Sequence, residues 1–248
     1  QTVTDADGNV YNTVTIGTQV WMQENLKTTK YNDGSEIPLV TDNTAWSELL
    51  TPGYCWYNND GATNKDDYGA LYNWYTVNTG KLCPAGWHVP ANSEWTNLIN
   101  YLGGEISAAG KLKESGITHW TDPNTGATNE SGFTALPGGR RFSNGLFGYV
   151  SDNGDWWSTT ELSSSIVLRF GLYFYYSTVY RDGIDMDFGL SVRCIKDTPV
   201  ATSIILKHTS QPSLNDGIIN ASDPWIESDW VDVSLSNINN STSAMTAK

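Results

Sequence analysis

The sequence has little charge, and positive charge is especially scarce. Only 17% of the 248 residues are charged, and 14 lysines and arginines, of which five are arginine, face 27 aspartates and glutamates. The formal net charge is −13 and the pI is near 4.4. Nucleic acids and anionic bilayers are bound by clustered cations, so this balance excludes nucleic acid as a partner and disfavours anionic membranes.

Long apolar runs and metal-binding spacings are lacking too. No stretch approaches the roughly 18 apolar residues of a membrane-spanning helix, so we expect no membrane insertion. The three cysteines contain no Cys-x-x-Cys pair and the three histidines stand far apart, so we predict no metal centre. Acidic turns at residues 5–9 and 60–67 lack the calcium-loop spacing, so no cofactor is expected and calcium is only the alternative.

The chain starts at Gln1 without a leader, which we interpret as an exported protein whose signal peptide has been removed. The predicted location is extracellular, at the cell surface. In such an oxidising location, three cysteines favour one long-range disulfide and one leftover thiol.

Aromatic residues and glycine are plentiful, with 11 Trp, 13 Tyr and 23 Gly. This composition is typical of a β- and loop-rich domain with a neutral, aromatic surface. We place that domain at residues 1–197. Residues 198–248 are rich in Ser, Asn and Thr, have few apolar groups, and are predicted to form a β-prone extension that packs on a partner or a neighbouring subunit.

Local patterns predict the elements of the domain. A hairpin turn is expected at residues 5–9. Helices are expected over about 67–77 and 92–102, where apolar residues recur at i, i+3 and i+4. The expected strands cover residues 13–16, 19–22, 156–160, 167–176 and 189–195.

The strand at 167–176 supplies a candidate binding face. Its even positions, Leu168 to Phe174, are apolar and predicted to be buried, whereas its odd positions carry polar and aromatic groups. Tyrosine and arginine make low-entropy contacts at binding surfaces. The predicted ligand-binding residues, expected to be exposed, are Arg169, Tyr173, Tyr175, Tyr180 and Arg181, with Trp157 as the outward member of the Trp156-Trp157 pair. Arg140-Arg141 is interpreted mainly as a simple surface pair, with a carboxylate-binding or intersubunit contact as the alternative.

Several longer motifs are specific to one family. GYCWYNND (53–60), YGALYNWY (68–75), LCPAGWHVP (82–90), GFTALPGG (132–139) and the closing SVRC (191–194) resemble the Fibrobacter succinogenes major paralogous domain. More distantly, the sequence is similar to the formylglycine-generating enzymes, which share a C-type-lectin-like architecture. The resemblance implies an α+β fold with two helices and an irregular, loop-rich antiparallel sheet. It also implies a disulfide between Cys83 and Cys194, with Cys55 free.

The resemblance does not extend to catalysis. Residues 161–188, where those enzymes carry their reactive cysteines, contain none here. We therefore predict a non-catalytic, exported bacterial module for ligand recognition or adhesion, whose partner is a protein or a glycan. The alternative is a structural subunit of an extracellular filament, which binds copies of itself through residues 198–248. A formylglycine-generating-type oxidase is the remote alternative.

Overall fold

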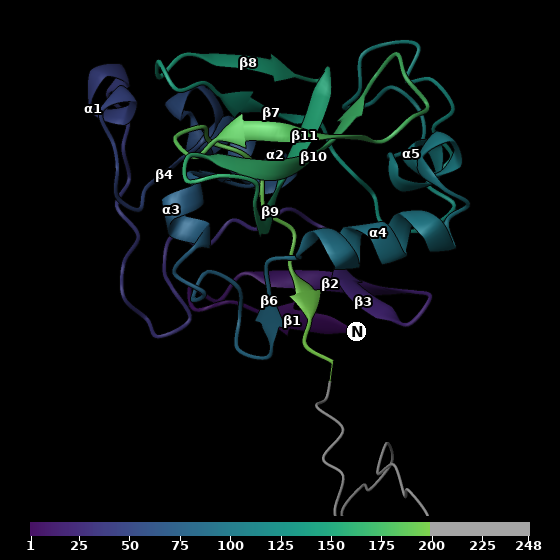
Figure 1. Ribbon diagram of the computed structural model, residues 1–248, viewed down its shortest axis with the longest axis horizontal. Coiled ribbons are helices and arrows are strands. Elements are labelled where there is room, and N and C mark those ends of the chain that lie inside the picture. The colour runs from purple at the N-terminus through teal and green to yellow at the C-terminus, as the bar shows by residue number, and fades with distance from the viewer. Residues whose placement is uncertain (199–248) are drawn as a thin grey trace, which may run out of the picture. The chain divides into compact units, whose positions relative to one another are not determined.

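Two five-stranded sheets with helices between and beside them make up the domain (Figure 1). The computed structural model describes residues 1–198, and Gln1–Asp197 form one unit by their internal contacts. The mixture of helices with mostly antiparallel sheets is the predicted α+β class. In the described part of the chain, no helix is both long and apolar enough to cross a membrane.

The first sheet joins the start of the domain to its end. Its strand order is β1-β2-β3-β12-β6, and every pairing is antiparallel. Its turn between the first two strands is the predicted hairpin turn, because Asp5 Oδ1 accepts from the N–H of Asp7 and Asn9 at 3.0 and 2.9 Å. The strands are β1 (Thr2–Thr4), β2 (Val10–Ile16), β3 (Gln19–Met22), β6 (Trp87–His88) and β12 (Ile195–Lys196).

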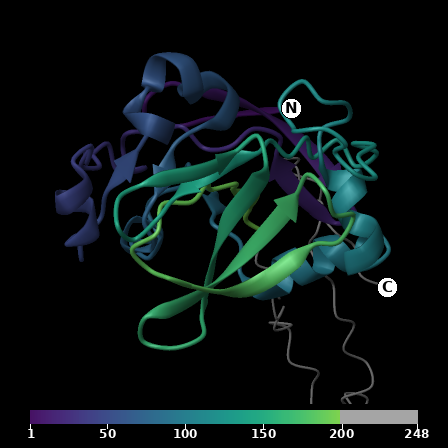
Figure 2. The same cartoon turned by 90° about the horizontal axis from the view of Figure 1, so that it is seen from above.

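The second sheet is strongly twisted. Its order is β11-β10-β9-β7-β8, with one parallel contact between β7 and β9. Figure 2 shows its green strands from above, with the purple and blue first part of the chain along one side. The strands are β7 (Gly138–Arg141), β8 (Phe147–Val150), β9 (Asn153–Glu161), β10 (Ile166–Tyr173) and β11 (Tyr180–Asp185). The strands predicted at 156–160 and 167–176 are confirmed as β9 and β10, although β10 ends at Tyr173.

Only one of the two predicted helices has the expected extent. The segment 92–102 forms α4 (Asn92–Tyr101), followed by α5 (Glu105–Leu112). The single helix over 67–77 is wrong, because α2 (Gly61–Tyr68) ends at Gly69, whose φ is 72°. A Cβ at Gly69 would lie 2.7 Å from the carbonyl oxygen of Leu26. The remaining elements are α1 (Asn43–Ser47), η1 (Tyr57–Asn59), α3 (Trp74–Val77) and the paired β4 (Tyr54–Cys55) and β5 (Leu71–Tyr72).

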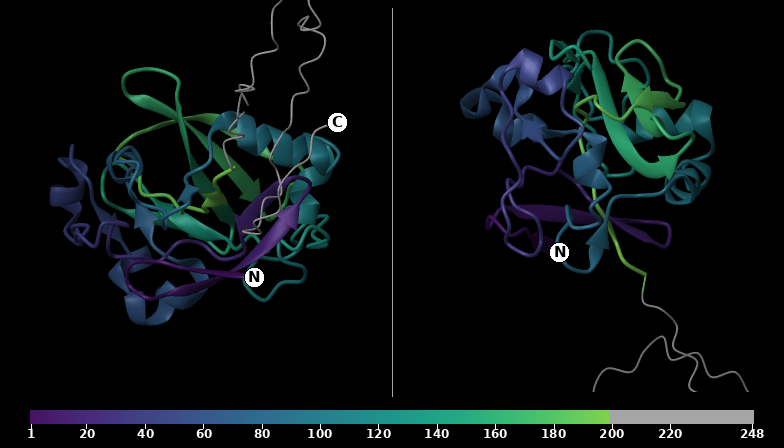
Figure 3. Two further views of the ribbon diagram at one scale, coloured as in Figure 1. Left: turned by 90° about the horizontal axis from the view of Figure 1, so that it is seen from below. Right: turned by 60° about the vertical axis from the view of Figure 1, so that its left-hand side comes forward.

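Helix α4 packs between the two sheets (Figure 1). Its Trp95 lies 4.9 Å from Trp21 of β3 and stacks on Phe170 of β10 at 4.7 Å between ring centroids. Figure 3 shows the purple first sheet and the green second sheet as separate layers. Each fully buried large apolar side chain in this layer contributes about 1.5–3 kcal/mol relative to exposure.

Three buried cations hold the irregular segments in place. Lys113, Arg141 and Arg193 are each 0% exposed. Lys113 Nζ donates to three backbone carbonyls, those of Thr125, Tyr173 and Tyr176, at 2.9–3.1 Å. Arg141 likewise binds carbonyls of the loop before α1, at residues 40–42. Buried carbonyls outside regular structure need such donors, so these cations stabilise loops rather than pairing with acids. For Arg141, the predicted surface position is wrong.

The disulfide is the one that the resemblance implied. Cys83 and Cys194 are joined with their Cα atoms 6.0 Å apart, and Cys55 is free and buried. Burial raises the pKa of the Cys55 thiol to about 12, so the thiol is not activated. The bridge ties the residues just before β12 to the segment before β6. Of the strand predicted over 189–195, only its end is regular, since Leu190 and Ser191 form isolated bridges to Tyr72 and Trp156.

Candidate functional site

A row of alternating charges crosses one face of the second sheet. Its members are Arg140 of β7, Asp155 of β9, Arg169 of β10 and Asp182 of β11, one from each of four neighbouring strands. We call these four residues the charge ladder. Arg140 Nη2 lies 3.0 Å from Asp155 Oδ2, and Arg169 Nη1 contacts Asp155 Oδ1. The guanidinium of Arg169 also meets both oxygens of Asp182, at 2.9 and 3.0 Å.

The ladder is buried at its centre and open at its end. Asp155 is 0% exposed and Arg169 5%, whereas the Asp182 side chain is 55% exposed. Burial raises the pKa of Asp155, and the neighbouring Arg169 and Arg140 oppose that rise. Burial works to lower the pKa of Arg169, but Asp155, Tyr173 and Asp182 together more than reverse this effect, so Arg169 stays charged. The two arginines are therefore fixed in place by a common carboxylate.

Glycine at position 171 leaves room for this arrangement. Gly171 lies two residues after Arg169 on the same face of β10. A Cβ there would lie 3.0 Å from both Arg169 Nη1 and Asp155 Oδ1, and 3.3 Å from the hydroxyl of Tyr173. Arg169 Nη2 donates to that hydroxyl at 3.0 Å. The ladder and the tyrosine are thus packed against each other without intervening side chains.

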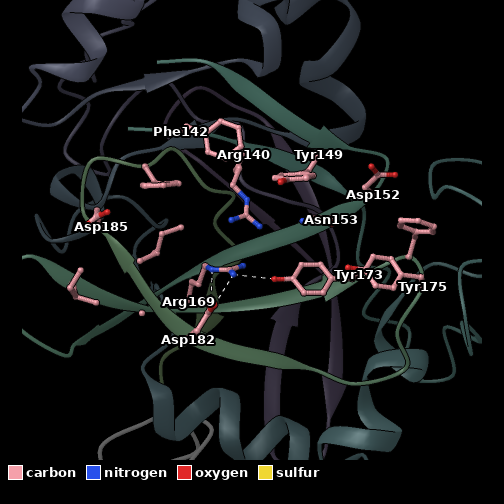
Figure 4. A pocket seen from close by; sticks show the side chains of 15 residues that line it. Arg140, Phe142, Tyr149, Asp152, Asn153, Arg169, Tyr173, Tyr175, Asp182 and Asp185 are labelled. Carbon is pink, nitrogen blue, oxygen red and sulfur yellow. Dashed lines mark hydrogen bonds and ion pairs between the residues drawn. The ribbon is translucent and has the colours of Figure 1, made fainter. Parts of the chain in front are cut away.

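Above the ladder lies a cavity of about 610 Å³. Figure 4 shows Arg140 reaching into it from one side and Arg169 from the other, with the ring of Tyr173 beside Arg169. Phe142, directly after β7, and Tyr149 of β8 form the wall on the side of Arg140, across from Arg169. Its volume falls in the range of about 300–1,000 Å³ that is typical of small-molecule sites.

Tyr149 is held in an unfavourable backbone conformation at this wall. Its φ is 68°, in the left-handed region that bulky residues rarely adopt. The ring is 48% exposed, packs on Phe142 at 5.8 Å and lies 5.1 Å from the guanidinium of Arg140. Backbone strain of this kind clusters at ligand sites, where the surrounding structure holds it.

A group of four tyrosines extends from the cavity. We call Tyr173, Tyr175, Tyr176 and Tyr180 the tyrosine cluster. Tyr173 lies 4.7 Å from Tyr180, and Tyr175 lies 4.2 Å from Tyr176 between ring centroids. Tyr175 and Tyr176 are 48% and 41% exposed. The cluster therefore carries an aromatic surface from the cavity wall to the outside of the domain.

The predicted site residues divide into three groups. Arg169, Tyr173 and Tyr175 line the cavity, and Tyr180 belongs to the tyrosine cluster. Arg181 is exposed as predicted but points to the other side of β11, toward α5, where it pairs with Glu105. Trp157 is fully buried and donates to the carbonyl of Tyr72, so its predicted outward position is wrong.

The predicted exposure of Arg169 is also wrong, because the carboxylates of Asp155 and Asp182 and the hydroxyl of Tyr173 enclose its guanidinium. The predicted burial of Leu168, Phe170 and Leu172 is confirmed, and Phe174 is half-buried. Arg140, Tyr149 and Asp182 also line the cavity and are not among the predicted site residues. The Arg140-Arg141 pair was the signal available for the first of these.

The histidines and acidic turns have structural partners. His88 contacts Glu94 and Asp197, and His119 contacts Glu114. Asp60 caps α2 by accepting from the N–H of Thr63. Within residues 1–198, no group of three or more His, Cys, Asp or Glu side chains could hold a metal ion. His208 lies outside the described residues.

Fold and site together define an α+β domain with a polar, tyrosine-walled cavity on a twisted sheet. The model of the Fibrobacter succinogenes major domain matches residues 14–196, so this chain belongs to that family. Among curated proteins no match was found, and no solved structure matches the chain either.

Proposed function

We propose that this chain is a non-catalytic recognition domain of an exported bacterial surface protein, and that it binds its ligand in the cavity above the charge ladder. The observation that carries the proposal is the cavity itself. Its arginines are already fixed by Asp155 and Asp182, and its walls are aromatic. A preformed site of this kind binds without the cost of ordering its side chains.

The contacts of the charge ladder favour binding over chemistry at the centre of the cavity. A general base needs a carboxylate within reach of the substrate. Asp155 is buried beneath two guanidinium groups, and both oxygens of Asp182 are engaged by Arg169. An oxidase of the formylglycine-generating type needs reactive thiolates, whereas the free thiol of Cys55 is buried with a raised pKa.

We also propose that the protein is extracellular and that its fold is C-type-lectin-like. A disulfide such as Cys83–Cys194 persists in oxidising compartments, which supports an extracellular location. The paired helices α4 and α5 beside a twisted, loop-covered sheet support a C-type-lectin-like architecture.

Binding of the labelled 248-residue chain to arrays of glycans and of purified cell-surface proteins tests the proposal. Tyr175→Ala removes an exposed ring that lines the cavity, and Tyr101→Ala removes an exposed ring from α4 as the matched control. We expect binding to at least one ligand, weakened about tenfold or more by Tyr175→Ala, equivalent to about 1.4 kcal/mol. Equal loss in both variants, or no binding on either array, would contradict the proposal.

A further inference from the structure

The charges of the cavity argue against an ionic ligand. Five charged side chains line it, two positive and three negative: Arg140, Arg169, Asp152, Asp182 and Asp185. The two arginines are balanced by Asp182 and by the buried Asp155. An anion would approach Asp152 and Asp185 on a chain of net charge −13. A cation would meet two guanidinium groups at the centre (Figure 4).

The same cavity is well supplied with neutral contacts. Arg140 is held by its Nη2 contact to Asp155 and by packing on Tyr149. A guanidinium has five N–H donors, so Arg140 has donors left for a ligand hydroxyl. Carboxylate oxygens at the rim accept hydrogen bonds, and the rings of Phe142, Tyr149 and Tyr175 offer apolar faces.

From these contacts we infer that the ligand is an uncharged oligosaccharide, a deepening that rests on the proposed recognition function. A pyranose ring has C–H faces that pack on aromatic rings, and hydroxyl groups that donate to carboxylates and accept from guanidinium. It thereby uses both kinds of surface in the cavity without needing a counter-charge. Amphipathic aromatic side chains are suited to such half-apolar partners.

The tyrosine cluster indicates that the ligand is longer than one ring. Tyr175 lines the cavity. The ring centroid of Tyr176 lies 4.2 Å from that of Tyr175, and Tyr176 is 41% exposed. A saccharide unit bound in the cavity would therefore place the next units over Tyr175 and Tyr176. The cavity thus binds the terminal unit of the oligosaccharide, and the tyrosines bind the units that follow it.

The test is calorimetric titration of the full chain with neutral hexasaccharides of several linkages: malto-, cello-, manno- and laminarihexaose. Hexagalacturonate is the acidic counterpart, and its fully methyl-esterified form carries the same backbone without charge. We expect binding to at least one uncharged hexasaccharide, and at least tenfold weaker binding to hexagalacturonate than to its methyl ester where the ester binds. Preference for hexagalacturonate would overturn the inference and leave the recognition function standing.

The contact of further sugar units with Tyr175 and Tyr176 is tested with Tyr176→Ala. Its binding to the disaccharide and to the hexasaccharide of the linkage that binds is compared. The affinity of this variant for the hexasaccharide should fall at least threefold, whereas its affinity for the disaccharide should not change. Tyr101→Ala should change neither affinity. If Tyr176→Ala weakened binding of the disaccharide and of the hexasaccharide equally, the longer saccharide would not continue over the tyrosines. If no saccharide binds while a surface protein on the array does, the saccharide class is wrong, and if neither binds, the recognition function itself fails.

Discussion

At the scale of single residues, the buried cations explain how a loop-rich chain satisfies its backbone. Lys113 is the clearest case, because its ammonium group meets three carbonyl oxygens and lies 5.5 Å from the ring of Trp120. Burial lowers the pKa of Lys113 to about 8, so the group is still mostly protonated at pH 7. It joins the end of α5 to the loop at residue 125 and to the segment after β10, beside the cavity.

Replacing Lys113 by methionine keeps the apolar stem but removes the donors. Three part-buried carbonyls then lose the donor that they share, so we expect the free energy of unfolding at pH 7 to fall by about 2–4 kcal/mol. Urea denaturation of the oxidised protein measures this. Lys111→Met is the control, because Lys111 has only a 3.7 Å surface pair with Glu130, and its loss should cost less than about 1 kcal/mol. A similar cost for both variants would argue against the role of the carbonyl contacts.

Residue patterns predicted which side of β10 a side chain takes, but not how deeply it lies. The two-residue period correctly separates Arg169 and Tyr173 from Leu168 and Phe170. Depth depends on what covers each face of β9 and β10. Helices α4 and α5 pack on the face that carries Leu168 and Phe170. On the other face, the segment around Tyr72 packs on Trp157, and the side chains of Asp155, Asp182 and Tyr173 enclose Arg169. For that reason Arg169 and Trp157 are buried.

At the scale of elements, local signals succeeded where a residue pattern alone decides the conformation. The stripe of Trp95, Leu98 and Ile99 gave α4 correctly. The helix predicted over 67–77 was wrong because Gly69 packs against the backbone of Leu26, which is far away in the sequence, and because Leu71 and Tyr72 pair with β4. The cavity is lined by residues 140–188, and its shape depends on how the β7–β8 hairpin is placed relative to β9, β10 and β11, including the parallel contact of β7 with β9. No local pattern encodes that placement, so only some of the cavity residues could be predicted.

One side-chain bridge links three elements near the end of the domain. His88 of β6 lies between two carboxylates, with Nε2 2.8 Å from Glu94 of α4 and Nδ1 2.6 Å from Asp197, which follows β12. Glu94 also accepts from the N–H of Ala91 at 2.9 Å, which is the half of a capping box that the Glu side chain supplies at the start of α4. The hydrogen bond to Glu94, with that to Asp197, raises the pKa of His88 to about 9.

This shift predicts a pH-dependent contribution to stability. A histidine whose pKa rises from 6.5 to about 9 on folding stabilises the domain fully below pH 6.5, and the contribution is lost as the pH rises through 9. His88→Asn should therefore cost about 1 kcal/mol at pH 6, since the side chain is 41% exposed and screened by solvent, and almost nothing at pH 10. Urea denaturation at both pH values measures the difference. An NMR titration giving His88 a pKa near 6.5 would contradict the prediction.

At the scale of the whole molecule, the domain is closed by its last described residues. Strand β12 lies between β3 and β6, and the Cys83–Cys194 bridge ties the residues before it to the segment before β6. The family match ends at residue 196, next to the end of the Gln1–Asp197 unit. The strands of both sheets and the residues that line the cavity all lie within residues 2–196 of the described part of the chain. The predicted connector role of the C-terminal extension falls on residues outside the described part of the chain.

Truncation after Asp197 separates recognition from assembly. The short protein should fold, form the Cys83–Cys194 disulfide and bind the same saccharide as the full chain, because the whole charge ladder is retained. If residues 198–248 add a strand to a neighbouring sheet, the full chain should form polymers in light scattering and electron microscopy, whereas the truncated one stays monomeric. Polymers of the truncated protein, or a strictly monomeric full chain, would show that the extension is not a connector. Loss of saccharide binding on truncation would instead place part of the site in residues 198–248.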